Sequence, residues 1–414
     1  MTTSFLIDLD LPHVEIDSVK IDQDGNYIIR VHSTLIGGQC HQCGQPITKF
    51  HGYDREIKLK HLPIFGRETY LLIRLPRYQC LTCPKKPTTT QQVPWRERKS
   101  AYTKAYENHL LRELIGSTVE EVSLREGIGY EAVMGIVRRQ VREEVDWAEF
   151  ERLDQLGLDE ISLKKGHRDF VAIVSTRTAG KVSILAVLAD RKKETVKAFL
   201  HCIPRRLKQT VSCICSDLYE GFINPAKEVF GKRVRLVLDR FHVAKLYRKG
   251  LDNLRKQELK RLKNELTEQA YGELKGVMWV LRKKRTALTK ENQRLLEKLF
   301  EYSPQLKTAY GLQHQLTEIF ELNCSRSGGK RRLRNWIRRV QAVEAKCYEP
   351  FVKTLDKWIE EISNYFVKRE TSGFVEGLNN KIKVIKRRCY GILNKEHLFQ
   401  RISLDLLGYK TFLL

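Results

Sequence analysis

Apolar and polar residues alternate in short runs through the N-terminal part of the chain, for example at Tyr27–Val31 and Tyr70–Arg74. A period of two residues places successive side chains on opposite faces of a strand, so this pattern predicts β-hairpins. The Pro- and Thr-containing segment Pro84–Pro94 ends the alternation. We therefore predict a small β-rich domain over residues 1–97.

Apolar residues then recur at helical spacing over residues 104–144, where two glycine-containing breaks separate three predicted helices. Thr118 and Glu121 form a capping box at the start of the second helix. This layout predicts a helix-turn-helix DNA-binding domain over residues 98–150, with ordinary three-helix packing as the alternative. Its third helix carries basic residues placed for DNA contact, namely Arg138, Arg139 and Arg142.

An alternation of strand-like runs and helices follows from Leu153. Three consecutive strands joined by short turns should be antiparallel, and the later strand–helix–strand crossover adds parallel neighbours. The result is an α/β core with a mixed five-stranded sheet, whose order matches a ribonuclease-H-like fold. The predicted strands are 156–163, 170–176, 182–188, 211–215 and 234–238, with a helix at 193–203.

The remainder of the chain is charged and helical. We interpret residues 151–249 as the first part of a catalytic domain, 250–366 as a helical insertion, and 367–414 as the C-terminal part of the catalytic domain. Within the insertion, Lys330–Arg334 is the densest basic run. This run either contacts DNA or a partner subunit, or it is simply a solvated face of the helix.

Composition narrows the class of partner. The 414 residues include 75 Lys and Arg against 50 Asp and Glu, a formal net charge of +25, which favours nucleic acid, and with the resemblance given below double-stranded DNA, over an inert basic surface or a membrane surface. The N-terminus lacks the pattern of a signal peptide, and no apolar run is long enough to span a membrane. Ten cysteines, four of them in C-x-x-C pairs, suit a reducing compartment, so we expect a cytoplasmic protein with no membrane partner.

Two C-x-x-C knuckles predict a structural Zn²⁺ site. Cys40 with Cys43, and Cys80 with Cys83, offer four thiolates in two tight turns separated by 36 residues, which an intervening hairpin would bring together. Redox dithiols or unpaired cysteines are the alternatives. His41 and His61 are not needed as ligands.

Acidic residues occur where a ribonuclease-H-like sheet would need them. Metal-assisted phosphoryl transfer requires oxygen ligands that converge on divalent ions. Asp159 interrupts the apolar run of the first strand, and Asp217 follows the fourth. Alternation points Glu160 away from Asp159, so Glu160 is the alternative ligand. Taken singly, an acid at a strand end is more often a helix cap or turn residue.

Five motifs together resemble those of transposases of the ISL-three family of bacterial insertion sequences. The resemblance covers nearly the whole chain in the family's order, with a zinc-binding N-terminus, a helix-turn-helix and a DDE catalytic domain interrupted by a helical insertion. The motifs are Gly157–Glu160, Lys164–His167, Asp217–Tyr219, Asp239–His242 and Ser372–Lys383.

The resemblance implies an acidic triad of Asp159, Asp217 and Glu376 that binds Mg²⁺, or Mn²⁺ in substitution. It also implies an activity, which is cleavage and strand transfer at the terminal inverted repeats of the element and into target DNA. Synapsis of two DNA ends would require a homodimer or a higher oligomer.

The last motif also makes chemical sense on a helix. Glu376, Asn379, Asn380 and Lys383 share one face, because they lie three, four and seven residues apart, and this face suits metal and phosphate. The alternative is a solvated charged face. The next turn extends the positive charge towards DNA with Lys386, Arg387 and Arg388, and the opposite side is apolar, with Val375, Leu378, Ile382 and Ile385.

Asp239 and His242 leave three interpretations open. Asp239 competes with Asp217 as the second metal ligand, or both residues orient DNA or a flipped base, or they form a buried pair that touches no substrate. Two other functions also stay open for the chain. One is a catalytically silent, transposase-derived DNA-binding regulator, and the other is a nuclease without transfer activity.

Overall fold

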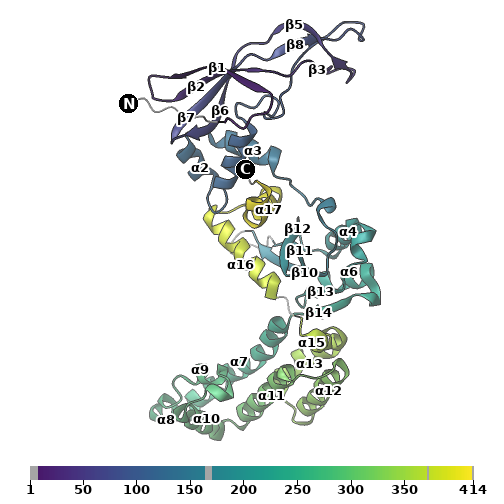
Figure 1. The fold of residues 1–414 in the computed structure, drawn as a ribbon. Helices are drawn as coiled ribbons and strands as arrows, with labels where there is room; N and C mark the ends of the chain where they lie inside the picture. The colour runs from purple at the N-terminus through teal and green to yellow at the C-terminus, as the bar shows by residue number, and fades with distance from the viewer. Residues whose placement is uncertain (1–7, 164–169, 371–372, 413–414) are drawn as a thin grey trace. The chain divides into compact units, whose positions relative to one another are not determined.

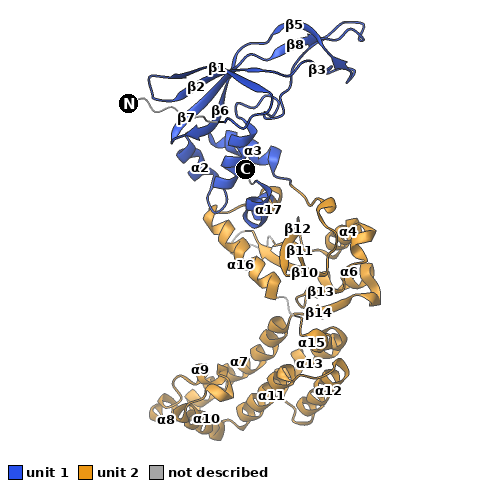
Figure 2. Ribbon diagram, in the orientation of Figure 1, with its two compact units in different colours: residues 1–142, 400–414 blue, residues 143–399 orange. Residues whose placement is uncertain are grey.

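The computed structural model describes residues 8–163, 170–370 and 373–412 (Figure 1). The chain forms two compact units, one of residues 1–142 with 400–414 and the other of residues 143–399 (Figure 2). The last fifteen residues, which the sequence pattern assigns to the catalytic part, thus belong to the N-terminal unit.

The first unit begins with a four-stranded sheet in the order β1-β2-β7-β6. Alternate residues of its strands, such as Ile29 and Val31 or Leu71 and Ile73, are buried, which confirms the predicted β-rich domain. The hairpin of β6 and β7 lies in the chain between the two cysteine pairs. The strands are β1 (Val14–Ile21), β2 (Tyr27–Ser33), β6 (Ile57–Ile64) and β7 (Arg67–Ile73).

Two smaller sheets of the same unit flank the cysteines. β3 pairs with β4, and β5, β8 and β9 form a three-stranded antiparallel sheet. Each C-x-x-C turn therefore leaves one short strand and returns to another. The strands are β3 (Gly38–Gln39), β4 (Pro46–Ile47), β5 (Lys49–Tyr53), β8 (Pro76–Gln79) and β9 (Thr88–Thr90).

Three helices follow, α1 (Lys104–Glu113), α2 (Val119–Glu126) and α3 (Tyr130–Gln140). The predicted capping box is present at Thr118, and α2 ends at Gly127, whose φ of 63° is the left-handed conformation that favours glycine. The C-terminal helix α17 (Lys395–Thr411) packs on them. There, buried Arg401 donates hydrogen bonds to the carbonyl oxygens of Leu114 at 3.0 Å and Ser117 at 2.7 Å.

The second unit contains a mixed five-stranded sheet in the order β12-β11-β10-β13-β14. The first three strands in sequence are antiparallel, whereas β13 and β14 run parallel to β10, as predicted. The strands are β10 (Gln155–Ser162), β11 (Phe170–Thr178), β12 (Lys181–Leu188), β13 (Cys213–Ser216) and β14 (Arg235–Leu238).

Helices cover both faces of this sheet (Figure 1). One face, with Leu158 and Ile214, packs on α4 (Lys193–Cys202) and α6 (Glu220–Phe230). On the other face, Phe374 of α16 (Gly373–Arg388) contacts Cys213, Cys215 and Val237. Short helices complete the connections, namely η1 (Trp147–Glu149), α5 (Arg205–Lys208) and η2 (Gly231–Arg233).

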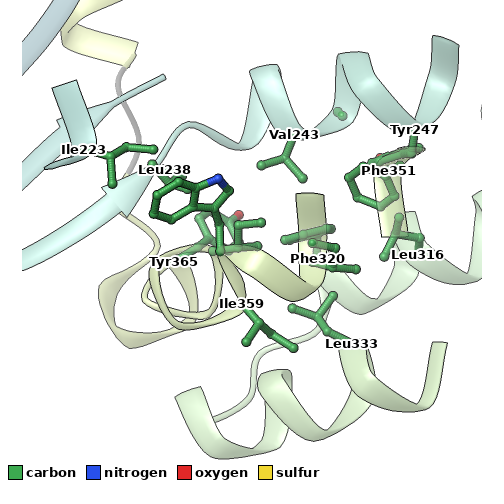
Figure 3. Close-up of a cluster of buried hydrophobic side chains, with 14 of the residues drawn as sticks. Ile223, Leu238, Val243, Tyr247, Leu316, Phe320, Leu333, Phe351, Ile359 and Tyr365 are labelled. Atoms are coloured by element: carbon green, nitrogen blue, oxygen red, sulfur yellow. The ribbon is translucent and has the colours of Figure 1, made fainter. Parts of the chain in front are cut away.

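A helical segment separates β14 from α16 in the chain and shares the core of the sheet. Leu238 and Val243 lie in one apolar cluster with Phe320, Leu333 and Tyr365 (Figure 3). Its helices are α7 (Arg240–Glu265), α8 (Glu268–Gly272), α9 (Val277–Arg282), η3 (Arg285–Ala287), α10 (Lys290–Tyr302), α11 (Pro304–Glu321), α12 (Arg326–Ala342), η4 (Lys346–Tyr348), α13 (Glu349–Lys357), α14 (Ile359–Ser363) and α15 (Tyr365–Lys368). In the described parts of the chain, none of the helices is long and apolar enough to cross a membrane.

Candidate functional site

The four predicted cysteines come together in the N-terminal unit. The sulfur atoms of Cys40, Cys43, Cys80 and Cys83 all lie within 4.8 Å of one another. Sγ of Cys40 is 4.0 Å from that of Cys83, and Sγ of Cys43 is 3.7 Å from that of Cys80. Zn–S bonds of about 2.3 Å in a tetrahedron place the sulfurs roughly 3.8 Å apart. The four thiols therefore fit a structural Zn²⁺ ion.

Backbone geometry prepares these thiols for a cation. The amide of Cys40 donates to the carbonyl of Gln45, and the amide of Cys80 to that of Pro87, each at 2.9 Å, so the two knuckles close in the same way. Backbone N–H groups, led by that of Cys83, lower the pKa of Cys80 to about 6. Crowding of the sulfurs, led by contact with Cys43, raises the pKa of Cys83 to about 12. A divalent cation would favour ionisation of all four.

The two histidines near this region have other partners. The imidazole Nδ1 of His41 is 2.9 Å from Oγ1 of Thr89. His61 is buried, its Nδ1 is 2.9 Å from Oγ1 of Thr103, and burial lowers its pKa. Both imidazoles thus contribute hydrogen bonds to the fold.

Three acids lie at one level on neighbouring parallel strands of the second unit, Asp159 within β10 and the other two directly after β13 and β14. Leu158 of β10 and Leu238 of β14 both pair with Ser216 of β13, and the next residue on each strand is an aspartate. Asp159, Asp217 and Asp239 are therefore adjacent in register at the carboxyl edge of β13 and β14. The sequence left Asp217 and Asp239 as alternatives for the second metal ligand, whereas the strand register places both beside Asp159.

Helix α16 provides a direct contact to the first of these acids. The side-chain amide of Asn379, which is buried, donates a hydrogen bond to Oδ2 of Asp159 at 2.6 Å. The contact depends on Gly157, because a Cβ there would lie 2.4 Å from Cγ2 of Val375 on the same helix. Glycine therefore allows α16 to approach β10 closely enough for Asn379 to reach the carboxylate.

The carboxylates of Asp159 and Asp217 affect each other. Burial raises the pKa of Asp159, although the backbone N–H of Glu160 donates to its Oδ1 at 2.7 Å. Burial, and then the negative charge of Asp159, raise the pKa of Asp217 to about 7. His242 opposes both shifts. Two carboxylates held together in this way resist simultaneous ionisation unless a cation neutralises them.

Several polar atoms at this site are buried without a hydrogen-bond partner in the described residues. They are Oδ1 of Asp217, Oδ1 of Asn379 and Nδ1 of His242. Asp239 differs, because its Oδ1 accepts from the backbone N–H of Phe241 at 3.0 Å and so caps α7. Its Oδ2 is 3.6 Å from Nδ1 of His242. Asp239 thus has a structural role that Asp217 lacks.

Glu376 lies three residues before Asn379, but its carboxylate does not cluster with those of Asp159 and Asp217. It is exposed on α16, one turn before Asn379. Among the residues described, the four cysteines are the one group of three or more potential ligands whose donor atoms all lie within 4.8 Å of one another. The carboxylates of Asp159, Asp217 and Glu376 thus do not all lie within that distance. Asn380 and Lys383 are exposed on the same helix.

Glu160 faces an arginine that reasoning from the sequence missed. It forms an ion pair with Arg191, whose guanidinium lies 4.6 Å from the ring centroid of Phe170 and 4.7 Å from that of Tyr219. Arg191 belongs to no motif and lies just after β12, so nothing in the sequence marked it. This pairing gives Glu160 a partner other than the Asp159 group.

The basic residues predicted to contact DNA differ in their surroundings. Arg138 and Arg139 are both exposed. Arg139 forms an ion pair at 2.7 Å with fully buried Glu107, and Arg138 forms one at 3.2 Å with exposed Glu131. Arg142 lies beyond the end of α3.

On α16, Lys386 donates to the carbonyl oxygens of Ser162 and Leu163, the latter at 2.9 Å, and so holds the end of β10. Burial lowers its pKa. Nε of Arg387 donates to the carbonyl of Lys383 at 3.3 Å, and Arg388 is partly buried. The motif residues Lys164–His167 and Ser372 lie outside the described residues.

Two family comparisons match the chain. The DDE transposase domain of the ISL3 family, described as a transposase, matches residues 156–402, and the zinc finger of the IS204, IS1001, IS1096 and IS1165 transposases matches residues 37–83. A zinc ribbon followed by this mixed-sheet domain defines a transposase of insertion sequences. The chain belongs to the ISL3 transposase family, as the sequence motifs predicted.

Curated relatives agree over almost the full length. The chain is 24% identical over 366 residues to the transposase for insertion sequence element IS1001 of Bordetella parapertussis, covering 88% of this chain and 87% of the relative. It is 23% identical over 404 residues to the transposase for insertion sequence element IS1557 of Mycobacterium tuberculosis, covering 91% and 87%.

Proposed function

We propose that this chain binds the terminal inverted repeats of its insertion sequence and catalyses metal-dependent cleavage and strand transfer. The sheet, in the order β12-β11-β10-β13-β14, would be a ribonuclease-H-like core. The observation that supports this most is the pair of aspartates Asp159 and Asp217, which lie side by side on adjacent parallel strands. Both have a raised pKa, and Asn379 donates a hydrogen bond to Asp159.

The residues present fit a hard divalent cation at this edge. Asp159 and Asp217 supply carboxylate oxygens, which Mg²⁺ prefers, and Oδ1 of Asp217 is buried without a hydrogen-bond partner in the described chain. Bound Mg²⁺ or Mn²⁺ would polarise a phosphoryl oxygen and help to deprotonate the attacking water or 3′ hydroxyl. The protein's part is to hold the two carboxylates in register, and the bound cation would favour ionisation of both.

Asp217 is the better candidate for the second ligand. Asp239 is occupied as the cap of α7, which is the ordinary structural role of an aspartate at a strand end. Asp217 caps no helix, because α6 begins after Tyr219. In this assignment Asp239 and His242 orient the Asp217 region and the DNA that enters it.

Glu376 completes the proposed triad from α16. Residues three apart on a helix are neighbours, so Glu376 lies beside Asn379, whose amide already touches Asp159. An exposed glutamate can change rotamer at small cost, whereas Asp159 and Asp217 are fixed by strands. We therefore assign Glu376 as the mobile third ligand, and Asn380 and Lys383 as groups that face the phosphate backbone.

The N-terminal unit would recognise the DNA ends. In this proposal α2 and α3 form the helix-turn-helix. Arg138 is the basic residue placed to reach DNA, because it is exposed and its ion-pair partner Glu131 is exposed as well. The zinc ribbon holds the preceding sheets together. Because two ends must be joined, the active species contains at least two chains.

A cleavage and strand-transfer assay tests the proposal. Wild-type protein with Mg²⁺ should nick and join DNA that carries the terminal repeats, and Asp159→Asn, Asp217→Asn and Glu376→Gln should each lose at least a hundredfold in rate. Glu228→Gln, an acid paired with Lys193 on the same unit, is the matched control. End binding without any cleavage by the wild type would instead indicate a regulator. Full activity in a triad variant would remove that residue from the triad.

A further inference from the structure

One helix of the insertion carries positive charge without any acid. Helix α12 contains Arg326, Lys330 and five further arginines, and no Asp or Glu. Arg331, Arg334 and Arg338 are exposed and lie three and four residues apart in turn, so they form one row along the helix. The row spans seven residues, or about 10 Å at 1.5 Å per residue.

The other side of α12 is fixed in the apolar core. Leu333 and Trp336 are fully or almost fully buried, and the indole N–H of Trp336 donates to the carbonyl of Leu312 at 2.8 Å. A Cβ at Gly329 would lie 2.3 Å from the ring of Phe366, so the helix packs very closely there. The exposed row therefore sits on a rigid support.

The residues of this row lack ion-pair partners among the described residues, although the negative charge of Glu360 does act on Arg334. Elsewhere in the same unit arginines pair with carboxylates, as Arg255 does with Asp252 and Arg261 with Glu258. On α12, by contrast, Glu360 pairs with Arg326 and Lys330 at the start of the helix.

The three residues of the row form no ion pair with a carboxylate in the part of the chain that the structure describes. The hydrogen bond of Arg338 is a long one, at 3.4 Å, to the neutral side chain of Asn335. Three cations within about 10 Å repel one another, and a bound polyanion would offset this repulsion.

The chemistry of the row indicates which anion that is. All three residues are arginines, whose planar guanidinium binds phosphate in a bidentate manner, rather than lysines. Phosphates of one strand of duplex DNA are spaced about 3.4 Å along the axis, so a 10 Å row matches about three of them. The exposed residues beside the row are Asn335 and Arg339.

We propose that Arg331, Arg334 and Arg338 form a phosphate-binding row that holds duplex DNA against the insertion without reading its sequence. This inference rests on the proposed function, which makes DNA the substrate. It goes further by assigning the insertion a DNA contact independent of the helix-turn-helix. The row contributes to the affinity for DNA and not to recognition of the repeat sequence.

The test is the salt dependence of DNA binding by the full chain with its zinc retained. Arg331→Gln/Arg334→Gln/Arg338→Gln should make the slope of log K against log [salt] less negative by about 2 to 3, since each phosphate contact contributes about 0.9. Affinity should fall on the order of 10²-fold at 0.1 M salt. The loss should be equal on repeat-bearing DNA and on random duplex. Arg→Lys at the same three positions should keep most of the slope.

A control variant removes the same charge from lysines that have acidic partners. Lys256→Gln/Lys298→Gln/Lys357→Gln should leave the slope nearly unchanged, because Asp252, Glu273 and Glu220 already neutralise these lysines. Thermal unfolding of both triple variants should match the wild type.

Three results would contradict the proposal that this row binds phosphate. They are an unchanged slope in the arginine variant, a loss confined to repeat-bearing DNA, and lost chain–chain association with normal DNA binding. Failure of the proposed function would look different, because the wild type itself would then neither bind DNA ends nor cleave them.

Discussion

Substitution of Gly157 tests whether the close approach of α16 to β10 builds the site. A Cβ at residue 157 would lie 2.4 Å from Cγ2 of Val375, 2.6 Å from Oγ of Ser175 and 3.0 Å from Cε2 of Phe374. Carbon atoms in ordinary contact are about 3.5–4.0 Å apart, so Gly157→Ala must displace the helix by roughly 1 Å or more. Overpacking of this kind costs about 1–3 kcal/mol of stability.

The same displacement should affect catalysis more than folding. The hydrogen bond from Asn379 to Asp159 is 2.6 Å long and would not survive a shift of that size. Misplacement of a catalytic group by about 1 Å costs on the order of 10²-fold in rate. We therefore expect Gly157→Ala to remain folded while strand transfer falls about a hundredfold.

The assays are urea unfolding and the strand-transfer rate with saturating Mg²⁺. Gly377→Ala on the same helix is the matched control, since a Cβ added there would meet nothing within 4 Å and alanine should stabilise a helix interior by about 0.5–1 kcal/mol. Adding Val375→Ala to Gly157→Ala removes the nearest clash and should restore part of the stability. Wild-type stability and rate in Gly157→Ala would refute the reasoning.

Three further predictions concern the two metal centres. Asn379→Leu should weaken Mn²⁺ binding and strand transfer by about 10–100-fold, because Asp159 loses the donor that orients it; an unchanged Mn²⁺ titration would contradict this. Elemental analysis should find about one zinc per wild-type chain and none in Cys80→Ser, and retention of zinc in this variant would exclude the four-cysteine site. In zinc-loaded protein without Mg²⁺, the urea stability of the wild type relative to Asp217→Asn should rise as pH falls from about 7 towards 5. The raised pKa of Asp217 means that its folded state binds the proton more tightly than the unfolded state, and a constant difference between the two proteins would contradict this.

Much of the fold could be predicted from the sequence, because local patterns determine it. Strand-like runs located the five strands of the second unit's sheet, and β2 and β7 of the first unit, to within a few residues. Thr118 with Glu121 marked the start of α2. The cysteine pairs identified the zinc site, since two tight turns restrict where the sulfurs can point.

The contacts within the site depend on tertiary packing, which no local pattern reveals. The buried amide of Asn379 stood on the predicted polar face of its helix, but its contact with Asp159 required the glycine at 157 to admit that helix. Strand register placed Asp239 beside Asp217, whereas the sequence alone left the two as alternatives for the second metal ligand. Likewise, Arg139 looked available to DNA until the fold brought Glu107 to it, 32 residues away in the chain.

The assignment of Asp159, Asp217 and Glu376 as metal ligands is the central claim, and a change of metal preference tests it most directly at Asp217. A thiolate is a poor ligand for Mg²⁺ but accepts softer divalent ions such as Mn²⁺. Strand transfer by Asp217→Cys should therefore be lost in Mg²⁺ and recovered in Mn²⁺, whereas Asp239→Cys should show no such change of preference. Wild-type activity of Asp217→Cys in Mg²⁺, or Mn²⁺ rescue of Asp239→Cys alone, would contradict the account.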